Sequence, residues 1–333
     1  MLFVQDKMNN LKTVCVIGAG LSGLACARAL QAAGWQVTVL DKSRGPAGRM
    51  STRRGDDWQC DHGARYFTAS DPRFMAEVSA WQRAGVAASW TPRLAVIDGE
   101  QSESSGAQPV RYVGVPRMTA PARYLADALS LQLQQTVHAL EPSPAGWYVH
   151  TLESGALAQP FRAVVLAVPA PQAQPLLADV APELAGLAAK ARMTGTWTLM
   201  VRYTTPLALP FDAAFVNRGA LRWVAREASK PGRPSCETWL LQASTVWSEA
   251  HIEAEPERVA EALLAAFRDL GAPAPAAWTA HRWRYADTAT PLACAYQWSA
   301  GQGIGLCGDW LADGRVEGAW LSGVRLAEAM GSP

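Results

Sequence analysis

The sequence predicts an α/β fold of two domains, one built on a parallel sheet and the other on an antiparallel sheet. Three observations predict it. A buried strand, a glycine-rich turn, a helix and a second strand follow one another in residues 12–41. A short strand, an acidic residue and a helix close the chain at 303–330. Between them, apolar side chains alternate along 197–203 and 221–225, as in antiparallel strands with one covered face.

Composition agrees with two folded domains. The chain has 333 residues, which favours about two domains, and 49% are hydrophobic, which excludes a disordered chain. Its formal net charge is +1, which argues against a nucleic-acid partner or a polybasic membrane anchor. No apolar run approaches the roughly 18 residues of a membrane span. We therefore expect neither a nucleic-acid partner nor a membrane.

The cysteines and the first residues bear on the compartment. None of the six cysteines has C-x-x-C spacing, so we expect free thiols in a reducing cytoplasm. The five histidines form no metal-binding cluster in the sequence, so we expect no metal. Residues 1–11 lack the apolar stretch of a signal peptide, and Met8 is an alternative start to Met1.

The first element pair predicts a dinucleotide-binding unit. Residues 12–17 form a continuous apolar strand, and the sequence Gly18-Ala-Gly20-Leu-Ser-Gly23 follows at once, before a helical pattern that ends near Gly34. In a Rossmann-like unit the first glycine makes the tight turn, the second admits a pyrophosphate and the third lets the helix pack on the strand. The next strand, 36–40, ends at Asp41, which can accept ribose hydroxyls. These residues leave NAD and FAD both open.

Two later features favour FAD. Arg44 and Arg49 follow Asp41 directly, and arginine binds phosphate oxygens in a bidentate way. At the other end of the chain, Asp309 follows the strand 303–308, and backbone N–H groups around Glu317, Gly318 and Ala319 begin a helix. Such a helix start can stabilise negative charge on the pyrimidine side of a reduced flavin. We therefore interpret the two ends together as a flavin site.

The motifs resemble a known family. The chain is similar to the flavin-containing amine oxidase superfamily and, within it, to the bacterial renalases. The resemblance covers residues from about 12 to the end. It rests on 41–45, 48–50, 61–68, 164–170, 281–286, 308–310 and 315–323.

The resemblance implies a p-hydroxybenzoate-hydroxylase-like fold with non-covalent FAD and an α+β substrate domain. It also implies the cofactor contacts, which are Gly18, Gly20, Ser22, Gly23, Asp41, Lys42, Arg44, Arg49, Met50, Gly63, Ala64, Arg65, Val137, Asp309, Val316, Glu317 and Ala319. One departure is Pro46-Ala47, where the family usually has a small residue and a glycine. The proline fixes φ and removes a donor, which changes what this loop can offer a phosphate.

The rest of the chain predicts a divided organisation. We expect a discontinuous FAD-binding domain of residues 11–72, 111–170 and 286–333, and a substrate domain of 73–110 and 171–285, with a polar loop at 98–108. Helices are expected at 121–133 and 256–270. Strands are expected at 136–140, 147–152 and 161–168.

The resemblance implies an oxidase. Bacterial renalases take hydride from dihydronicotinamide dinucleotides reduced at ring position 2 or 6, which gives NAD(P)+, and O2 reoxidises the flavin to give H2O2. No general base is required, and the pocket has only to orient a flat ring. The candidates for that work are Tyr66, His281 and Trp283. Two alternatives stay open, a flavin amine oxidase or desaturase of another small substrate and a non-catalytic flavin-binding redox sensor.

Overall fold

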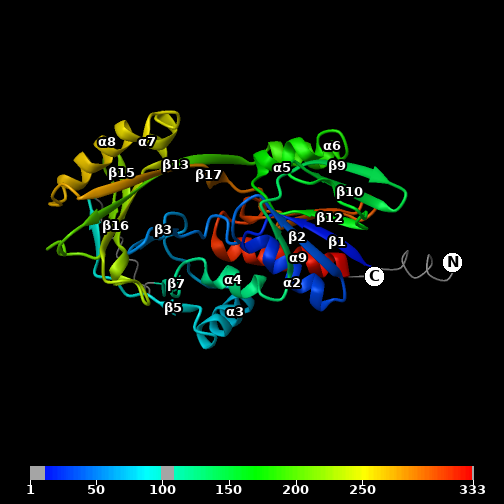
Figure 1. Ribbon diagram of the computed structural model, residues 1–333, viewed down its shortest axis with the longest axis horizontal. Coiled ribbons are helices and arrows are strands. Elements are labelled where there is room, and N and C mark those ends of the chain that lie inside the picture. Colours follow the sequence, from blue (N-terminus) through cyan, green and yellow to red (C-terminus); the bar gives the residue numbers. More distant parts are fainter. Residues whose placement is uncertain (1–11, 99–108, 332–333) are drawn as a thin grey trace. The chain divides into compact units, whose positions relative to one another are not determined.

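The structure is a computed structural model that describes residues 12–98 and 109–331 (Figure 1). The expectations about the chain start and about loop residues 99–108 lie outside the described residues. Contacts between Cα atoms divide the chain into two compact units, each assembled from separate segments. The first unit comprises 1–48, 122–193 and 288–333, and the second comprises 49–121 and 194–287.

These units differ from the expected division in four segments. Residues 49–72 and 111–121, with 286–287, group with the second unit, and residues 171–193 group with the first. The last shift has a clear physical cause. Helices α5 (Ala170–Leu177) and α6 (Pro182–Ala189) bury small side chains such as Ala173 and Ala185 in the first unit's core.

The first unit is a layered α/β structure around a six-stranded sheet. The strand order is β18 (Tyr296–Ser299), β19 (Ile304–Cys307), β12 (Ala163–Leu166), β1 (Thr13–Ile17), β2 (Gln36–Asp41) and β8 (Ser130–Leu133). All pairs are parallel except β18–β19. The strands β1, β12 and β19 are apolar and almost wholly buried, as expected for a parallel sheet covered on both faces.

Helices α2 (Leu21–Ala32) and α9 (Val316–Gly331) lie side by side in this unit (Figure 1). A three-stranded meander of β9 (Val137–Ser143), β10 (Gly146–Thr151) and β11 (Gly155–Ala156) joins the core that contains α5 and α6. A short 3₁₀ helix, η2 (Asp309–Leu311), follows β19. The expected dinucleotide-binding unit and closing strand–helix pair are therefore confirmed as secondary structure.

One expected helix is wrong over half its length. The helix predicted at 121–133 ends early, as α4 (Ala120–Ala126), and Ser130–Leu133 form the edge strand β8. The four residues of β8 alternate polar and apolar, a period of two that fits a strand better than a helix. Their pairing with β2 decides the outcome, because it satisfies backbone groups that a longer helix would have to satisfy itself.

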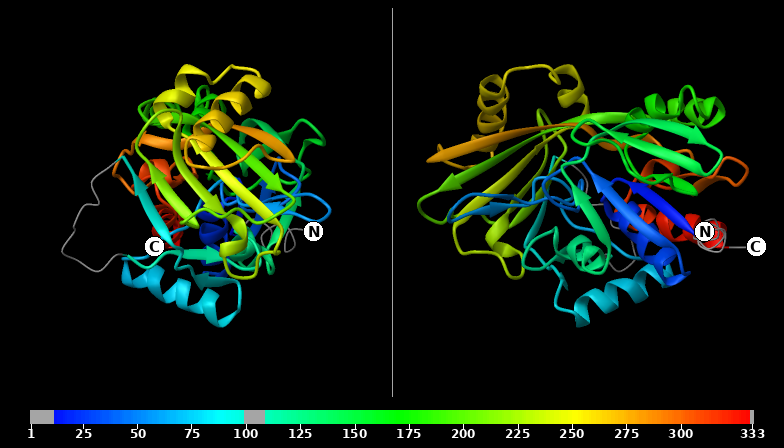
Figure 2. Two further views of the ribbon diagram at one scale, coloured as in Figure 1. Left: turned by 90° about the vertical axis from the view of Figure 1, so that its left-hand side faces the viewer. Right: turned by 45° about the vertical axis from the view of Figure 1, so that its right-hand side comes forward.

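The second unit is built on a mainly antiparallel six-stranded sheet. Its order is β17 (Ala277–Thr290), β13 (Arg192–Tyr203), β16 (Glu237–Ala243), β15 (Leu221–Arg226), β14 (Ala213–Val216) and β6 (Leu94–Ile97). Figure 2 shows α7 (Thr245–Ala250) and α8 (Pro256–Arg268) against one face of this sheet. Val259, Leu263 and Phe267 of α8 are fully buried there beside Trp197 and Trp239. The expected helix 256–270 is confirmed.

The opposite face of this sheet carries a cross-strand row of side chains. The register places Phe215, Trp223, Gln242 and Thr198 directly opposite one another on β14, β15, β16 and β13. The smaller elements of the unit are β3 (Arg53–Arg54), β4 (Gln59–Cys60), α3 (Pro72–Arg83), β5 (Ala87–Ser89), β7 (Tyr112–Gly114) and the 3₁₀ helix η1 (Glu227–Ser229). Within residues 12–98 and 109–331, no helix is long and apolar enough to cross a membrane.

Candidate cofactor and substrate residues

The glycine-rich turn has the geometry that the motif requires. Gly18 has a φ of +110°, which other residues rarely adopt, and it connects β1 to the turn. A Cβ on Gly23 would lie 2.0 Å from the carbonyl oxygen of Gly18, so only glycine lets α2 pack this close to the turn. A Cβ on Gly20 would meet nothing within 4 Å, which leaves the approach to the helix N-terminus open.

The N-terminus of α2 retains polar groups that a phosphate could use. Its N-cap residue, Gly20, provides no side-chain hydrogen bond, so the first backbone N–H groups of the helix lack a cap. The hydroxyl of Ser22 is buried without a hydrogen-bond partner. Orphaned donors at a helix N-terminus favour an anion. The residues therefore fit the pyrophosphate of a dinucleotide such as FAD.

The end of β2 carries the acidic residue of the motif. The Asp41 carboxylate accepts hydrogen bonds from the backbone N–H of Ala19 and of Ser43, both at 2.7 Å. A carboxylate has about four lone-pair sites, so these two bonds leave capacity for ribose hydroxyls. Lys42 and Arg44 follow and are exposed. The backbone N–H groups of residues 134 and 135 donate to the carbonyls of Ser43 and Asp41. Val137, the expected adenine contact, follows two residues later as the first residue of β9.

The loop that departs from the family pattern is pinned to the turn. The N–H of Ala47 donates to the carbonyl of Ala19 at 2.9 Å, and Ala47 and Gly20 form an isolated parallel bridge. Ala47 has a φ of +118°, an unusual value for a residue with a Cβ. The proline at 46 removes only its own donor, so the bond that attaches this loop to the turn is retained.

The residues expected at the far end of the flavin site lie within the first unit. Asp309 is 5% exposed, and one of its carboxylate oxygens accepts from the Thr288 hydroxyl at 3.3 Å. Helix α9 begins at Val316, as expected for the helix start next to a flavin. One detail differs, because the N–H of Ala319 donates to the carbonyl of Arg315 at 2.9 Å. That amide is therefore bonded inside the helix.

In the second unit, residues 49–65 are held against each other by backbone contacts. The carbonyl oxygen of Arg49 accepts from the N–H of Ala64 at 2.8 Å, and a Cβ on Gly63 would lie 1.9 Å from that same oxygen. The Arg49 guanidinium donates to the carbonyl of Ala286 at 3.2 Å, and Met50 is buried. Gly63 is thus required by close packing, which gives the Gly63-Ala64-Arg65 motif a structural reason.

Two of the three expected catalytic side chains meet in a group that we call the imidazole–indole wall, composed of His62, His281 and Trp283. The His62 and His281 rings lie edge to face at 4.7 Å, and the His62 and Trp283 rings stack at 5.3 Å. Trp283 Nε1 donates to the carbonyl of His62 at 2.8 Å. Burial, with the nearby His281 and Arg53, lowers the pKa of His62 to about 3. Burial and Arg53 lower the pKa of His281 to about 4, so both rings are neutral at pH 7.

Tyr66, the third expected catalytic residue, belongs to a different group. Its ring lies 5.6 Å from Trp223 and 6.4 Å from Trp90, and the Arg111 guanidinium lies 5.4 Å from its centroid. Arg65 lies 5.2 Å over the Trp223 ring. Burial and the neighbouring Arg222 lower the pKa of the Arg65 guanidinium to about 10, and it remains charged at pH 7. This second group therefore offers a cation on an aromatic support.

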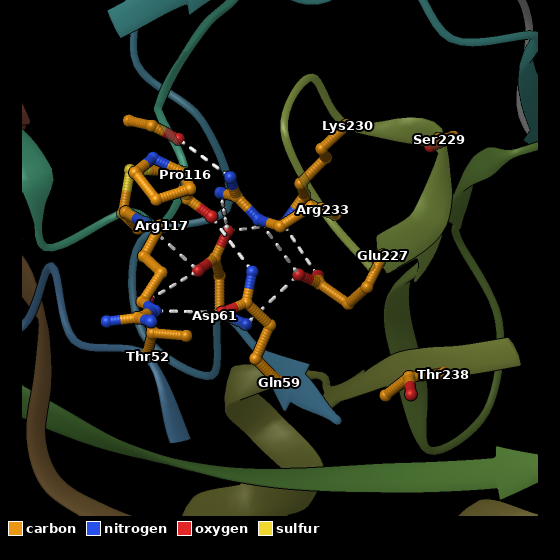
Figure 3. Close-up of polar contacts among 12 residues, drawn as sticks. Thr52, Gln59, Asp61, Pro116, Arg117, Glu227, Ser229, Lys230, Arg233 and Thr238 are labelled. Carbon is orange, nitrogen blue, oxygen red and sulfur yellow. Dashed lines mark hydrogen bonds and ion pairs between the residues drawn. The ribbon is translucent and has the colours of Figure 1, made fainter. Parts of the chain in front are cut away.

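Two features of the second unit were not expected from the sequence. One is the role of His62 beside His281 and Trp283. The sequence feature that could have indicated it is its position directly before the Gly63-Ala64-Arg65 motif. The other is a buried ion cluster of Asp61, Glu227, Lys230 and Arg233, shown in Figure 3. Lys230 belongs to this cluster and is fully buried. Its ammonium lies between the carboxylates of Asp61 and Glu227, at 3.0 and 2.6 Å.

The fold, the phosphate turn and the closing helix together define a flavin-binding oxidoreductase. Comparison with known families agrees and is more specific. Residues 16–80 match the NAD(P)-binding Rossmann-like domain, and residues 81–331 match the flavin containing amine oxidoreductase family. The chain belongs to this flavin containing amine oxidoreductase family. Membership confirms the expected cofactor, FAD, and the expected class of enzyme, an FAD-dependent oxidoreductase.

Solved structures share the fold at low identity. Cyclohexylamine oxidase from Brevibacterium oxydans is similar with a TM-score of 0.76 and 14% identity, over 96% of this chain and 98% of that one. Wild-type putrescine oxidase bound to putrescine is similar with a TM-score of 0.70 and 15% identity, over 96% of this chain and 99% of that one. At such identities the likeness establishes the fold alone, and the expected two-domain α/β architecture is confirmed.

Sequence relatives match over a short segment. An L-amino-acid oxidase of Sistrurus catenatus edwardsii is 47% identical over 55 residues, and one of Gloydius halys is 49% identical over 57 residues. Each match covers 16% of this chain and 11% of the relative. The chain therefore matches only about a tenth of the length of these oxidases, and its substrate is a matter for proposal.

Proposed function

We propose that this protein is an FAD-dependent oxidase of isomeric dihydronicotinamide dinucleotides. Its substrate would carry a dihydropyridine ring reduced at position 2 or 6. Loss of a hydride from that ring gives the aromatic cation NAD(P)+. O2 takes up the two electrons and the proton of that hydride, with one further proton from solvent, to give H2O2. The oxidation breaks one C–H bond and needs no proton removal from the substrate.

The observation that carries the proposal is the imidazole–indole wall. Both imidazoles are neutral at pH 7, because their pKa values are lowered to about 3 and about 4. Neutral imidazoles place no positive charge where the product cation forms. Trp283 supplies an aromatic face, and its N–H is already used by the His62 carbonyl, so the ring is held in one orientation. Such a wall suits a flat ring that becomes cationic.

The buried lysine gives a second line of support. Lys230 is fully buried, and it bonds to two carboxylates. Burial alone would lower its pKa, but Asp61 and Glu227 outweigh that effect and raise it. An ammonium held in this way does not act as a base. Lys230 is therefore not available as the base that removal of a proton from an amine would need.

When bound, FAD supplies the hydride acceptor and the route of the electrons to O2. We propose that the α2 N-terminus with Gly20 and Ser22 holds its pyrophosphate and that Asp41 holds the adenosine ribose. Arg65 is proposed to hold an anionic or polar group. The remaining proposed cofactor contacts are Gly18, Gly23, Lys42, Arg44, Arg49, Met50, Gly63, Ala64, Val137, Asp309, Val316, Glu317 and Ala319.

The decisive experiment is anaerobic mixing of the FAD-loaded protein with 2-, 4- and 6-dihydro-NAD, each followed at the flavin absorbance band. Rapid bleaching by the 2- or 6-isomer, with NAD+ as product, is the expected result. Bleaching by amines alone would contradict the proposal. Comparison of the phosphorylated and unphosphorylated dinucleotides then distinguishes NAD from NADP preference.

An amine oxidase is the second candidate. It is favoured by the family match and by the aromatic group of Tyr66, Trp90 and Trp223, which could enclose a small apolar amine. Cyclohexylamine and putrescine belong in the same anaerobic series for this reason. We also propose a cytoplasmic location, because all six cysteines are free thiols.

A further inference from the structure

The second unit contains four charged side chains that are almost completely hidden from solvent. We call Asp61, Glu227, Lys230 and Arg233 the buried quartet; their side chains are between 0 and 2% exposed. Lys230 Nζ lies 3.0 Å from Asp61 Oδ2 and 2.6 Å from Glu227 Oε1. Arg233 bonds to Asp61 Oδ2 and lies 3.8 Å from Glu227 Oε2 (Figure 3). Two positive and two negative charges sum to zero.

Stability alone does not explain this arrangement. Removing ions from water costs several kcal/mol per ion, and well-packed apolar replacements of buried ion pairs are often neutral or stabilising. What ionic groups add is direction, because each donor and acceptor has a defined partner. Lys230 and Arg233 hold the pKa of Asp61 well below its usual range, although burial by itself would raise it. Asp61 is therefore an anion with fixed partners.

The bonds of Asp61 join three segments that are distant in sequence. Its Oδ1 accepts from the Thr52 hydroxyl at 2.6 Å and from the N–H of Met118 at 3.1 Å. Its own N–H donates to Glu227 Oε2 at 3.1 Å. Arg233 also donates to the carbonyl of Gly114 at 2.9 Å. Both the backbone and the side chain of residue 61 are thus held from the 114–118 turn and from the loop after β15.

The residues after Asp61 are fixed one by one. The carbonyl of His62 accepts from Trp283 Nε1, Gly63 packs on the carbonyl of Arg49, and the N–H of Ala64 donates to that carbonyl. Arg65 then stacks over Trp223. The quartet anchors the start of this series. His62 of the wall follows directly, and three proposed flavin contacts, Gly63, Ala64 and Arg65, lie within four residues of Asp61.

We propose that the buried quartet is a positioning device that fixes segment 61–65 in one conformation. Glu227 and Lys230 are positioning residues, since they act through Asp61. The consequence for flavin and substrate rests on the proposed function, but the fixing of the segment does not.

The test uses a double variant, Glu227→Gln with Lys230→Met. It removes one positive and one negative charge and leaves the Asp61–Arg233 pair in place. Gln keeps the length of Glu, and Met is an unbranched apolar side chain one atom shorter than Lys. The control is Asp98→Asn with Arg218→Met. This removes an ion pair of the same unit, at 2.7 Å, whose side chains are 48 and 53% exposed. A single Glu227→Asp variant, which keeps the charge but withdraws the acceptor from the Asp61 N–H, serves if the double variant fails to fold.

The readout is hydrogen–deuterium exchange of the full chain, with and without FAD. We expect exchange in peptides covering 60–66 to quicken at least about tenfold in the quartet variants, while peptides from β13 and β16 keep their wild-type rates. The control should match the wild type throughout. We also expect FAD to bind more weakly to the quartet variants and not to the control.

Unchanged exchange at 60–66 would overturn the proposal, and so would an equal increase across the whole second unit, which is the signature of lost stability alone. Failure of the proposed function is distinguishable. It would appear as a wild-type flavin that no dihydronicotinamide isomer reduces, with the exchange result intact.

Discussion

Gly23 offers a sharp test of the proposed cofactor turn, because a single methyl group there would meet the backbone. In the substitution Gly23→Ala, the new Cβ lies 2.0 Å from Gly18 O and 2.9 Å from the Cβ of Ala167. Ordinary van der Waals contacts of a Cβ begin at 3.4 Å. The turn must therefore move by about 3.4 − 2.0 = 1.4 Å along that direction. Neither obstacle is the end of a flexible side chain.

Two opposing effects determine how much Gly23→Ala changes the free energy of unfolding. Alanine gains about 1 kcal/mol over glycine in a helix interior. Overpacking costs about 1–3 kcal/mol, and a backbone obstacle places this case at or above the upper end. The net loss of stability is therefore about 2 kcal/mol. If the free protein relieves the strain by displacing the turn, FAD binding must restore it, which weakens binding by up to about thirtyfold.

The assay is a fluorescence titration of the FAD-free protein with FAD, together with its thermal midpoint. Gly186→Ala is the matched control, because Gly186 lies inside α6 and its Cβ would meet nothing within 4 Å. We expect the control to bind FAD like the wild type and to be up to about 1 kcal/mol more stable. If Gly23→Ala also bound FAD normally with a raised midpoint, the close-packing account of the turn would be refuted.

Three further predictions concern named contacts. The folded pKa of His62, about 3, lies below its ordinary 6.5, so its stabilisation is full above about pH 6.5 and declines as pH falls toward 3. The wild type should therefore lose about 2 kcal/mol more unfolding free energy between about pH 7.5 and 5 than the variant His62→Gln, as measured by denaturant midpoints. Equal losses in the two proteins would contradict this prediction. Trp310→Phe removes a fully buried N–H donor that lies 3.1 Å from the Val168 carbonyl oxygen. We expect the free energy of unfolding, measured by denaturant titration, to fall by about 1–3 kcal/mol, and an unchanged value would show that the bond does not contribute. Trp283→Phe leaves the His62 carbonyl without the indole donor, so we expect flavin reduction to slow about tenfold in stopped-flow measurements. An unchanged rate would contradict the proposed role of Trp283 in orienting the substrate.

Local patterns account for what the sequence predicted well. The Gly18–Gly23 turn, the strands around it and Asp41 lie within one stretch of the chain, so spacing alone indicates their arrangement. His281 and Trp283 are two residues apart, and a strand places such residues on one face, so their meeting was predictable once β17 was assigned. The bonding at the start of α9 was less predictable, because whether the N–H of Ala319 is already bonded depends on the residue at which the helix begins.

The buried quartet lies beyond the reach of such patterns. Asp61 contacts Glu227 across 166 residues and Met118 across 57 residues. Only the packing of the second unit brings these segments together. The same holds for His62, whose ring contacts that of His281, a residue 281 − 62 = 219 positions later in the chain. A charged residue in a sequence is usually exposed, so nothing local indicates that these four are hidden.

The tryptophans show how far composition alone can indicate which aromatic side chains contact a substrate. Nine of the 14 belong to the second unit, namely Trp58, Trp81, Trp90, Trp197, Trp223, Trp239, Trp247, Trp278 and Trp283. Trp197 and Trp239 fill the core beneath α8, whereas Trp223 lies on the opposite face of the same sheet. Trp283 is distinguished by its bond to the His62 carbonyl and its stacking on a neutral imidazole. The abundance of tryptophan thus reflects sheet packing, and the proposed substrate chemistry depends on the ring whose neighbours are uncharged histidines.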